Sequence, residues 1–234
     1  MELAPGVHVL GGKKGGRVRA FLLDPVGSEL TLVDTLFDTD GALVLEEIRR
    51  LGRSESDLKH IVITHGHRSH LGGLAALKRA SGATVYAHEW EADIVSGDRR
   101  AQPVTLRPTQ GLRLMPFQIG LALNRPKHPP CPVDETLAEG ASVGPLRVLH
   151  APGHSPGHLV FHWPDRGFLI AGDAIATWPE LCPGWKPFNL NVEQQGESLR
   201  RMAELDAEIV GVGHGDPIVS GAADRVHELA ETMR

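Results

Sequence analysis

Short apolar runs separated by glycine, proline and charged residues recur along the first half of the chain, and they predict buried strands. We expect these strands over residues 7–10, 18–23, 30–33, 58–63 and 84–88. Between residues 41 and 51, leucine and isoleucine recur with charged residues between them, which predicts an amphipathic helix that ends at Gly52. The apolar stretch 71–78 predicts a second helix directly after the fourth run.

The second half of the chain repeats this alternation of strands and helices. Its apolar runs predict strands over residues 146–149, 159–163, 167–171 and 208–212. Longer amphipathic stretches predict helices over residues 192–205 and 222–233. Strands that alternate with helices indicate an α/β fold class.

The stretch between Glu89 and Glu135 has no such clear period. Its apolar residues from Leu112 to Leu123 fall at mostly alternating positions, and several prolines follow them. This segment is open to two interpretations: it forms part of a substrate pocket or a lid, the lid over residues 110–135, or it is ordinary core followed by a proline-stiffened loop. The aromatic residues Trp178, Trp185 and Phe188 are open to the same two interpretations, as a pocket lining or as packing under a long loop.

Three histidines fall within the segment 65–70, between the predicted strand 58–63 and the helix that follows. Residues i and i+2 at a strand end point to the same side, so His65 and His67 lie together, and the turn into the helix can bring His70 beside them. Neutral imidazole is a common ligand for zinc and other transition metals. The spacing therefore predicts a metal site. Ser69 also stands where a helix N-cap is expected, and serine is a strong N-cap residue.

The segment 64–70 resembles the HxHxDH signature of the metallo-β-lactamase superfamily, except that Ser69 stands where the family has aspartate. Three further blocks match the family in its order: residues 152–158, 171–173 and 213–215. The resemblance implies a four-layer αββα sandwich. It also implies that residues 1–234 form one domain built of two similar halves, about 1–135 and 136–234. The substrate does not follow, because one fold supports many chemistries.

The resemblance also assigns roles to individual residues. It implies two metal sites that share a bridging carboxylate: the first ligands are His65, His67 and His154, the second are His70 and His214, and Asp173 bridges them. We take Asp173 and Ser69 as the candidate catalytic residues. Serine carries no charge and is a poor ligand, so we expect a weaker second site and cations that are stronger Lewis acids. Asp34, after the strand 30–33, either supports the metal loops or caps a turn.

Composition excludes several functional classes. The net charge of -5 and the isoelectric point of about 6.2 do not favour nucleic acid as a partner. The sequence contains no apolar run of about 18 residues, so no membrane span is indicated. The first residues lack the basic and apolar regions of a signal peptide, and Cys131 and Cys182 are too few for a disulfide framework. We therefore expect a cytoplasmic protein that acts on a small molecule.

These observations favour a metal-dependent hydrolase that uses one or two zinc ions. A bound cation can lower the pKa of water from about 15.7 to about 7, so that hydroxide attacks a carbonyl at neutral pH. Esters, thioesters, lactones and β-lactams fit this chemistry. The apparent lack of a signal peptide argues against a secreted antibiotic-degrading enzyme, and the apolar segment 112–123 favours a small, partly apolar ester, thioester or lactone.

Two alternatives remain open at this point. The chain is also similar to the persulfide dioxygenases of the superfamily, and there one iron would be bound by His65, His154 and Asp173. Two histidines and a carboxylate suit non-haem iron. The second alternative is a relative that has lost catalysis and keeps the metal for structure, which the replacement of the family aspartate by Ser69 suggests.

Overall fold

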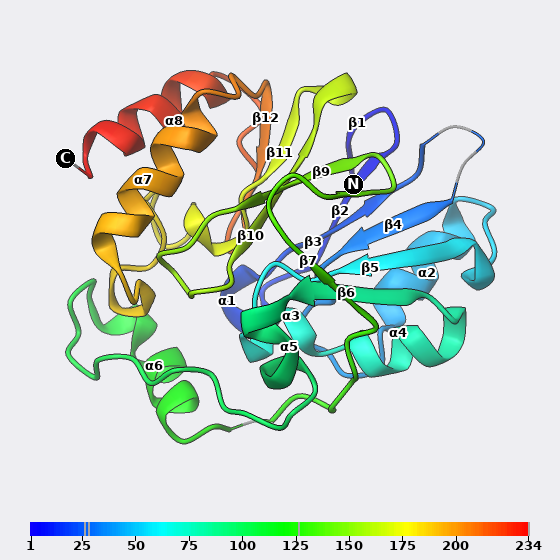
Figure 1. Ribbon diagram of the computed structural model, residues 1–234, viewed down its shortest axis with the longest axis horizontal. Helices are drawn as coiled ribbons and strands as arrows, with labels where there is room; N and C mark the ends of the chain where they lie inside the picture. Colours follow the sequence, from blue (N-terminus) through cyan, green and yellow to red (C-terminus); the bar gives the residue numbers. More distant parts are fainter. Residues whose placement is uncertain (26, 28, 126, 234) are drawn as a thin grey trace.

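A computed structural model of the chain describes residues 1–25, 27, 29–125 and 127–233. Two β-sheets pack against each other, and helices cover their outer faces (Figure 1). The first sheet has seven strands in sequential order: β1 (Glu2–Ala4), β2 (Val7–Leu10), β3 (Ala20–Leu23), β4 (Leu30–Val33), β5 (Leu58–Val62), β6 (Thr84–His88) and β7 (Glu135–Leu137). Neighbouring strands are antiparallel from β1 to β4 and parallel from β4 to β7.

The second sheet has five strands in the order β12-β11-β10-β9-β8. Only the pair β11 and β12 is parallel among the strand pairs described for this sheet. The chain passes from one sheet to the other after Leu137, because β7 still belongs to the first. The bounds are β8 (Ser142–Val143), β9 (Leu146–His150), β10 (Leu159–Trp163), β11 (Phe168–Ile170) and β12 (Ile209–Gly211).

The helices form the two outer layers and the loops around the site. The α-helices are α1 (Lys14–Arg17), α2 (Ala42–Arg50), α3 (Arg68–Leu71), α4 (Leu74–Ser81), α5 (Glu89–Val95), α6 (Met115–Ala122), α7 (Val192–Ala203) and α8 (Ala222–Glu231). The 3-10 helices are η1 (Glu55–Asp57), η2 (Leu112–Leu114), η3 (Pro164–Arg166), η4 (Gly172–Ala174) and η5 (Lys186–Phe188). No described helix is long and apolar enough to cross a membrane.

Three apolar cores separate the four layers. One lies between the first sheet and α2 and α4, where Ile48 and Leu77 meet the strands. A second lies between the two sheets, where Phe21 contacts Phe168 edge to face at 5.6 Å. The third lies between the second sheet and α7 and α8. The four-layer αββα sandwich expected from the sequence is confirmed, since both faces of each sheet are buried.

The longer predicted elements occur close to their expected positions, and the short ones were missed. The sequence did not predict β1, β7, β8, α1, α5 or α6 as elements. The apolar residues of 112–123, which fall at mostly alternating positions, form η2 and α6 rather than a strand.

The predicted helix 71–78 is wrong in detail, because it forms two helices, α3 and α4, which Gly72 and Gly73 separate. A β-carbon at Gly72 would lie 2.3 Å from the carbonyl oxygen of Phe37, so only glycine allows this close approach. The prediction of Ser69 as the N-cap is also wrong. His67 is the N-cap of α3, and Ser69 is its second residue. The chain becomes helical immediately after His67, which turns His70 back toward β5.

Candidate metal centre

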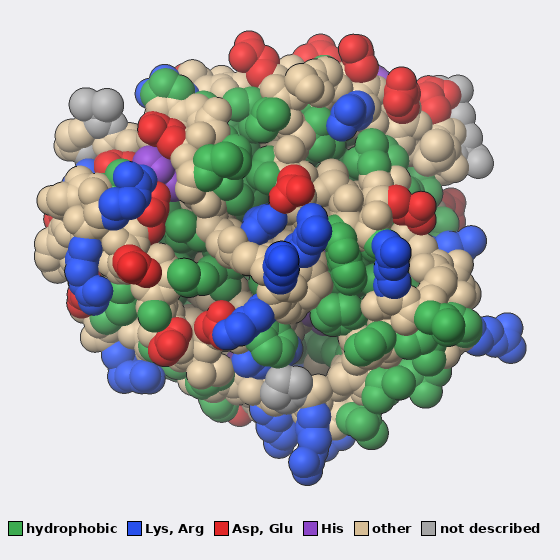
Figure 2. All heavy atoms as spheres, turned by 180° about the vertical axis from the view of Figure 1, so that it is seen from behind, with side chains coloured by type: hydrophobic (Ala, Val, Ile, Leu, Met, Phe, Trp, Pro, Cys, Tyr) green, Lys and Arg blue, Asp and Glu red, His purple; other side chains and the backbone are tan. Residues whose placement is uncertain are grey.

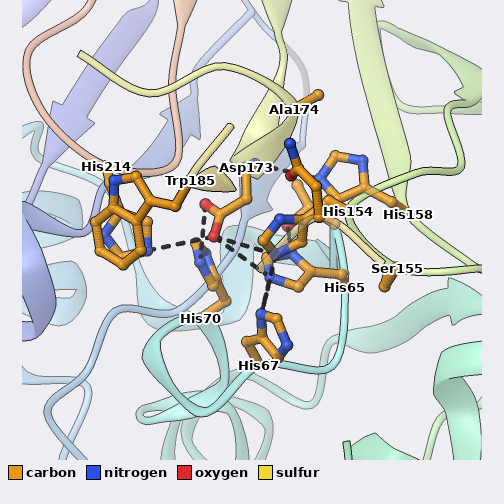
Figure 3. A network of polar contacts seen from close by, with 12 residues as sticks. His65, His67, His70, His154, Ser155, His158, Asp173, Ala174, Trp185 and His214 are labelled. Carbon is orange, nitrogen blue, oxygen red and sulfur yellow. Dashed lines mark hydrogen bonds and ion pairs between the residues drawn. The ribbon is translucent and has the colours of Figure 1, made fainter. Parts of the chain in front are cut away.

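The candidate ligands lie in loops after the carboxyl ends of four strands. His65 and His67 follow β5, His154 follows β9, Asp173 lies in η4 after β11, and His214 follows β12. His70 comes from α3. The two sheets bring these loops to the same edge, where the side chains point toward one another (Figure 3). Residues up to 149 positions apart in the sequence therefore share one site, as His65 and His214 do.

The first group comprises His65, His67, His154 and Asp173, whose ligand atoms lie within 4.8 Å of one another. Nδ1 of His67 lies 3.0 Å from Nε2 of His65 and 3.0 Å from Nε2 of His154. Oδ2 of Asp173 lies 3.6 Å and 3.5 Å from the same two Nε2 atoms. We call these four residues the first ligand set.

The second group comprises His70, His214 and Asp173. Oδ1 of Asp173 lies 3.3 Å from Nε2 of His70, and its Oδ2 lies 3.3 Å from Nε2 of His214. We call these three residues the second ligand set. Asp173 is common to both sets, and its two oxygens face histidines on either side (Figure 3). The structure thus brings together all six residues expected as ligands and groups them as the sequence suggested.

Hydrogen bonds orient three of these rings so that Nε2 faces the centre. Nδ1 of His214 donates to the carbonyl oxygen of Gly16 at 2.9 Å, and Nδ1 of His70 donates to Asp34 at 2.8 Å. Nδ1 of His65 donates to the hydroxyl of Thr64 at 3.0 Å, because that hydroxyl itself donates to Asp34. Each ring therefore directs Nε2 toward the centre, which is the arrangement of a metal-ligating histidine.

Several buried polar atoms at the centre have no hydrogen-bond partner. Nε2 of His70 and Oδ1 of Asp173 form no hydrogen bond, and they face each other at 3.3 Å as an ion pair. In the first set, Nδ1 of His67 faces two other imidazole nitrogens, which cannot all be satisfied by the protons available. A cation would satisfy these lone pairs together, so the residues present fit a divalent metal in both sets.

The electrostatics of the two sets differ. Burial lowers the pKa of His67 to about 4 and holds the pKa values of His65 and His154 well below the usual range, so these rings are neutral at pH 7. Burial also acts to lower the pKa of His70, but Asp173 and Asp34 outweigh it and raise the pKa to about 10. Burial acts to raise the pKa of Asp173, yet His214 and His70 hold it well below the usual range.

Asp34 supports the second set directly through His70 and the first set through Thr64, which favours the first of its two sequence interpretations. Its carboxylate accepts hydrogen bonds from the Thr64 backbone N–H, from the Thr64 hydroxyl and from His70. The residue is buried and has a φ of 60°, which non-glycine residues seldom adopt. This conformation aims the carboxylate at the loop that carries the histidines.

Glu91 is a supporting residue that sequence reasoning missed. It lies on α5 and is 2% exposed, and one of its oxygens accepts a hydrogen bond from the backbone N–H of Gly66 at 2.9 Å. The other oxygen accepts from the Ser155 hydroxyl at 2.7 Å and from the Gly157 N–H at 3.0 Å. Glu91 thus connects the loop of His65 and His67 to the loop of His154.

Two glycines make room for this carboxylate. A β-carbon at Gly66 would lie 2.9 Å from Oε2 of Glu91, and one at Gly157 would lie 2.9 Å from its Oε1. Both contacts are closer than real β-carbons adopt, so a side chain at either position would displace Glu91. The glycines beside the histidines were visible in the sequence, but their partner was not.

The other histidines of the second half lie outside both sets. His158 is buried; its backbone hydrogen-bonds within its own loop, as expected, and its ring accepts a hydrogen bond from the backbone N–H of Asp173 at 3.2 Å. Burial lowers its pKa to about 3. His150 stacks on His88 with ring centroids 4.5 Å apart. Of the four histidines spaced four residues apart, only His154 joins a ligand set, because turns separate them.

A cavity of about 250 Å³ opens beside the ligand sets. Its lining includes His67, Asp173 and His214 from the site, together with Ser69. The apolar part of the wall comprises Phe37, Phe117, Leu121, Trp185 and Phe188. Trp185 stacks on His214 with ring centroids 4.1 Å apart. Residues 110–125 thus contribute α6 to the wall, as expected for this segment, while Trp178 and Cys182 pack against it.

The family model for the metallo-beta-lactamase superfamily matches residues 14–214 of this chain. The chain belongs to this superfamily. A metallo-beta-lactamase fold accordingly carries both ligand sets, and the loops that hold them correspond to the blocks recognised in the sequence.

Similar proteins support this assignment. The chain is 27% identical over 234 residues to "Probable metallo-hydrolase YflN" of Bacillus subtilis (strain 168), covering 93% of this chain and 86% of that one. It is 27% identical over 197 residues to a hydroxyacylglutathione hydrolase of Cereibacter sphaeroides, covering 83% of this chain but only 61% of that protein. The crystal structure of TTHA1623 in a di-iron-bound form matches with a TM-score of 0.64 and 27% identity, covering 94% and 97%.

Proposed function

We propose that this metallo-beta-lactamase superfamily member is a metal-dependent hydrolase of small, partly apolar esters, thioesters or lactones. The observation that carries the proposal is the pair of ligand sets beside an apolar cavity: six histidine and aspartate side chains converge, and buried atoms among them lack hydrogen-bond partners. The similarity to a hydroxyacylglutathione hydrolase supports a thioester among the substrates, although the chain spans about three fifths of that protein.

The residues of the chain supply binding and orientation. A cation held by His65, His67, His154 and Asp173, or by the second set, would lower the pKa of a coordinated water to about 7 and make hydroxide available. Asp34 and the carbonyl oxygen of Gly16 keep His70 and His214 turned toward Asp173. The aromatic side chains of Trp185 and Phe188 exclude water from the apolar part of the substrate.

Ser69 has a proposed role at the wall of the cavity. It is half-buried and uncharged, where the family has an aspartate. Its hydroxyl can donate a hydrogen bond to an oxygen of the substrate, and it leaves the second set with three protein ligands. Three ligands and an open position are typical of a catalytic zinc site, whereas four close it. We therefore take zinc as the proposed metal, with iron as the alternative that the di-iron form of TTHA1623 suggests.

Metal content measured by mass spectrometry tests the proposal first. Protein purified without added metal should contain about two zinc ions per chain, one for each set. The same protein should hydrolyse at least one class in a panel of acyl-glutathione thioesters, nitrophenyl esters and lactones, and a chelator should abolish the activity until zinc is restored. A protein loaded with two metal ions that hydrolyses none of these classes would contradict the proposal. One iron per chain, with sulfite formed from glutathione persulfide, would establish the dioxygenase instead.

A further inference from the structure

Arg68 lies between His67 and Ser69 and lines the cavity. It is half-buried, and its guanidinium lies 4.3 Å from the centre of the Phe37 ring. Its Nη1 donates a hydrogen bond to the carbonyl oxygen of Phe37 at 2.7 Å. These contacts hold the planar group in one orientation at the wall, so little further rotational freedom would be lost when it binds a ligand.

The charge of Arg68 is not neutralised by the residues around it. Its Nε is buried without a hydrogen-bond partner. Burial lowers the pKa of Arg68 and Asp38 acts against this, but the guanidinium stays protonated in proteins. Asp38 itself lies in an ion pair with Lys14 at 2.6 Å. Among the described residues, no carboxylate lies within ion-pair distance of Arg68. A half-buried cation without an anion is costly unless a ligand supplies one.

The remaining charges of the wall do not supply that anion. Arg125, after α6, also lines the cavity and is exposed at its edge. Asp173 is the one carboxylate of the described lining, and both of its oxygens face histidines of the ligand sets. Ser69 stands where an aspartate would have placed a negative charge beside Arg68. Figure 2 shows a hollow on the face opposite to that of Figure 1, with Lys and Arg side chains close by and hydrophobic side chains on the neighbouring surface.

We propose that the cavity selects substrates with a carboxylate on the acyl side of the bond that is cleaved, and that Arg68 binds this carboxylate with Arg125 beside it. This inference rests on the proposed hydrolase function. Because Nη1 is engaged with Phe37 and Nε is buried, Nη2 is the donor that remains for the ligand. A charge-assisted hydrogen bond from Nη2 to a carboxylate oxygen is stronger than a hydrogen bond between neutral groups. The aromatic wall takes the carbon chain between the carboxylate and the reacting carbonyl.

A matched substrate pair tests this selection. One thioester carries a succinyl group, and the other carries its neutral amide, which has nearly the same size. The zinc-loaded protein should show a kcat/KM for the anionic member about 10- to 100-fold above that for the neutral one, as expected for hydrogen bonds to a charged group. Arg68→Gln should remove most of this ratio, and Arg68→Lys, which keeps the charge but not the planar guanidinium, should keep only part of it.

Control variants separate selection from other effects of charge. Arg125→Gln should lower the ratio by a smaller factor, since this side chain is exposed. Arg113→Gln changes an exposed arginine of the neighbouring η2 that does not belong to the described lining, and the ratio should stay as in the unmodified protein. An unmodified protein that prefers the amide, or a ratio that survives Arg68→Gln, would overturn the inference while leaving the hydrolase intact.

A binding measurement distinguishes failure of the inference from failure of the proposed function. If no substrate is hydrolysed, titration with succinate and with succinamide can be followed by tryptophan fluorescence, because Trp185 lines the cavity. Tighter binding of succinate that is lost in Arg68→Gln would support the carboxylate site without the hydrolase. Equal binding in both proteins would overturn the site as well.

Discussion

The two ligand sets share Asp173 but differ in how the chain completes them. The first set has three histidines and the aspartate, and Glu91 connects the two loops that carry those histidines. The second set has two histidines and the aspartate, supported by Asp34, by the carbonyl oxygen of Gly16 and by the stacked ring of Trp185. Only the first set therefore has four protein ligands.

This difference means that the first set can close the coordination shell of a metal, whereas the second set can leave its metal accessible. Four protein ligands close a coordination shell, and three leave a position for water or substrate. Ser69, at the place of the family aspartate, keeps the second set at three and lies on the cavity wall. The contrast teaches that a single replacement in a ligand motif need not destroy a site. We propose that it instead leaves an open position in the second set.

Asp173→Asn should have the largest effect, because Asp173 belongs to both sets and its oxygens lie 3.3–3.6 Å from histidines of each. The amide carries no charge and cannot bridge two cations. We expect metal content to fall in both sets and hydrolysis to drop by more than about 100-fold, beyond the usual effect of losing an outer-shell partner. Mass spectrometry and a thioester assay measure the two effects. Retention of both metals would show that the shared carboxylate does not join the sets.

Glu91→Ala and Asp34→Asn should change the metal affinities of the two sets to different extents. Removal of Glu91 leaves the N–H groups of Gly66 and Gly157 without their acceptor, so the first set should bind metal about 10- to 100-fold more weakly. Asp34→Asn should weaken the second set by a similar factor, because the amide no longer supplies a charge behind His70, and it should weaken the first set less, because Asp34 reaches His65 only through Thr64.

Competition with a coloured chelator and the absorption bands of bound Co²⁺ measure these affinities set by set. Ser155→Ala is a matched control for Glu91, since it removes one of the three hydrogen bonds and keeps the carboxylate. If Asp34→Asn weakens the first set more than the second, or Glu91→Ala weakens the second more than the first, the assignment of the two supporting residues is wrong.

Ser69→Asp should have a smaller effect, of about 10-fold on the affinity of the second set, because a fourth ligand is added to an existing three. Hydrolysis should fall as the open position closes. Ser69→Ala removes the hydroxyl without adding charge and shows how much of the loss belongs to the hydroxyl. A rise in hydrolysis after Ser69→Asp would mean that serine replaced a carboxylate that the reaction needs.

The smallest expected difference between the two sets is the release of a single proton when metal binds. In the metal-free protein His70 has a pKa of about 10, above its ordinary value, so it carries its proton at pH 7.5, whereas His67, with a pKa of about 4, does not. Filling the second set should release about one proton and filling the first almost none. The release should disappear as the pH rises through 10. Calorimetry in buffers of different ionisation enthalpy measures it, and equal release from both sets would contradict the electrostatic contrast.

The sequence predicted the ligands better than their supports. Histidines at i and i+2 after a strand were evident because local geometry determines which way such residues point, whereas His154, Asp173 and His214 were expected from the family resemblance. Asp34 was left between two interpretations, and Glu91 was missed, since it lies on a short helix that no strong period marked. Ser69 was wrongly expected as an N-cap, because the propensity of serine could not show that the helix begins directly after His67.

By itself, the sequence determined the α/β class, the main strands and helices, and the residue types that can hold a metal, because period and spacing are properties of neighbouring residues. Only the tertiary structure decided which residues meet. The packing of two sheets brings His65 and His214 to one edge, places Glu91 between two loops, and leaves Arg68 at the cavity wall without a carboxylate partner among the described residues. Such contacts join positions far apart in the chain, so they depend on burial and close approach rather than on local pattern.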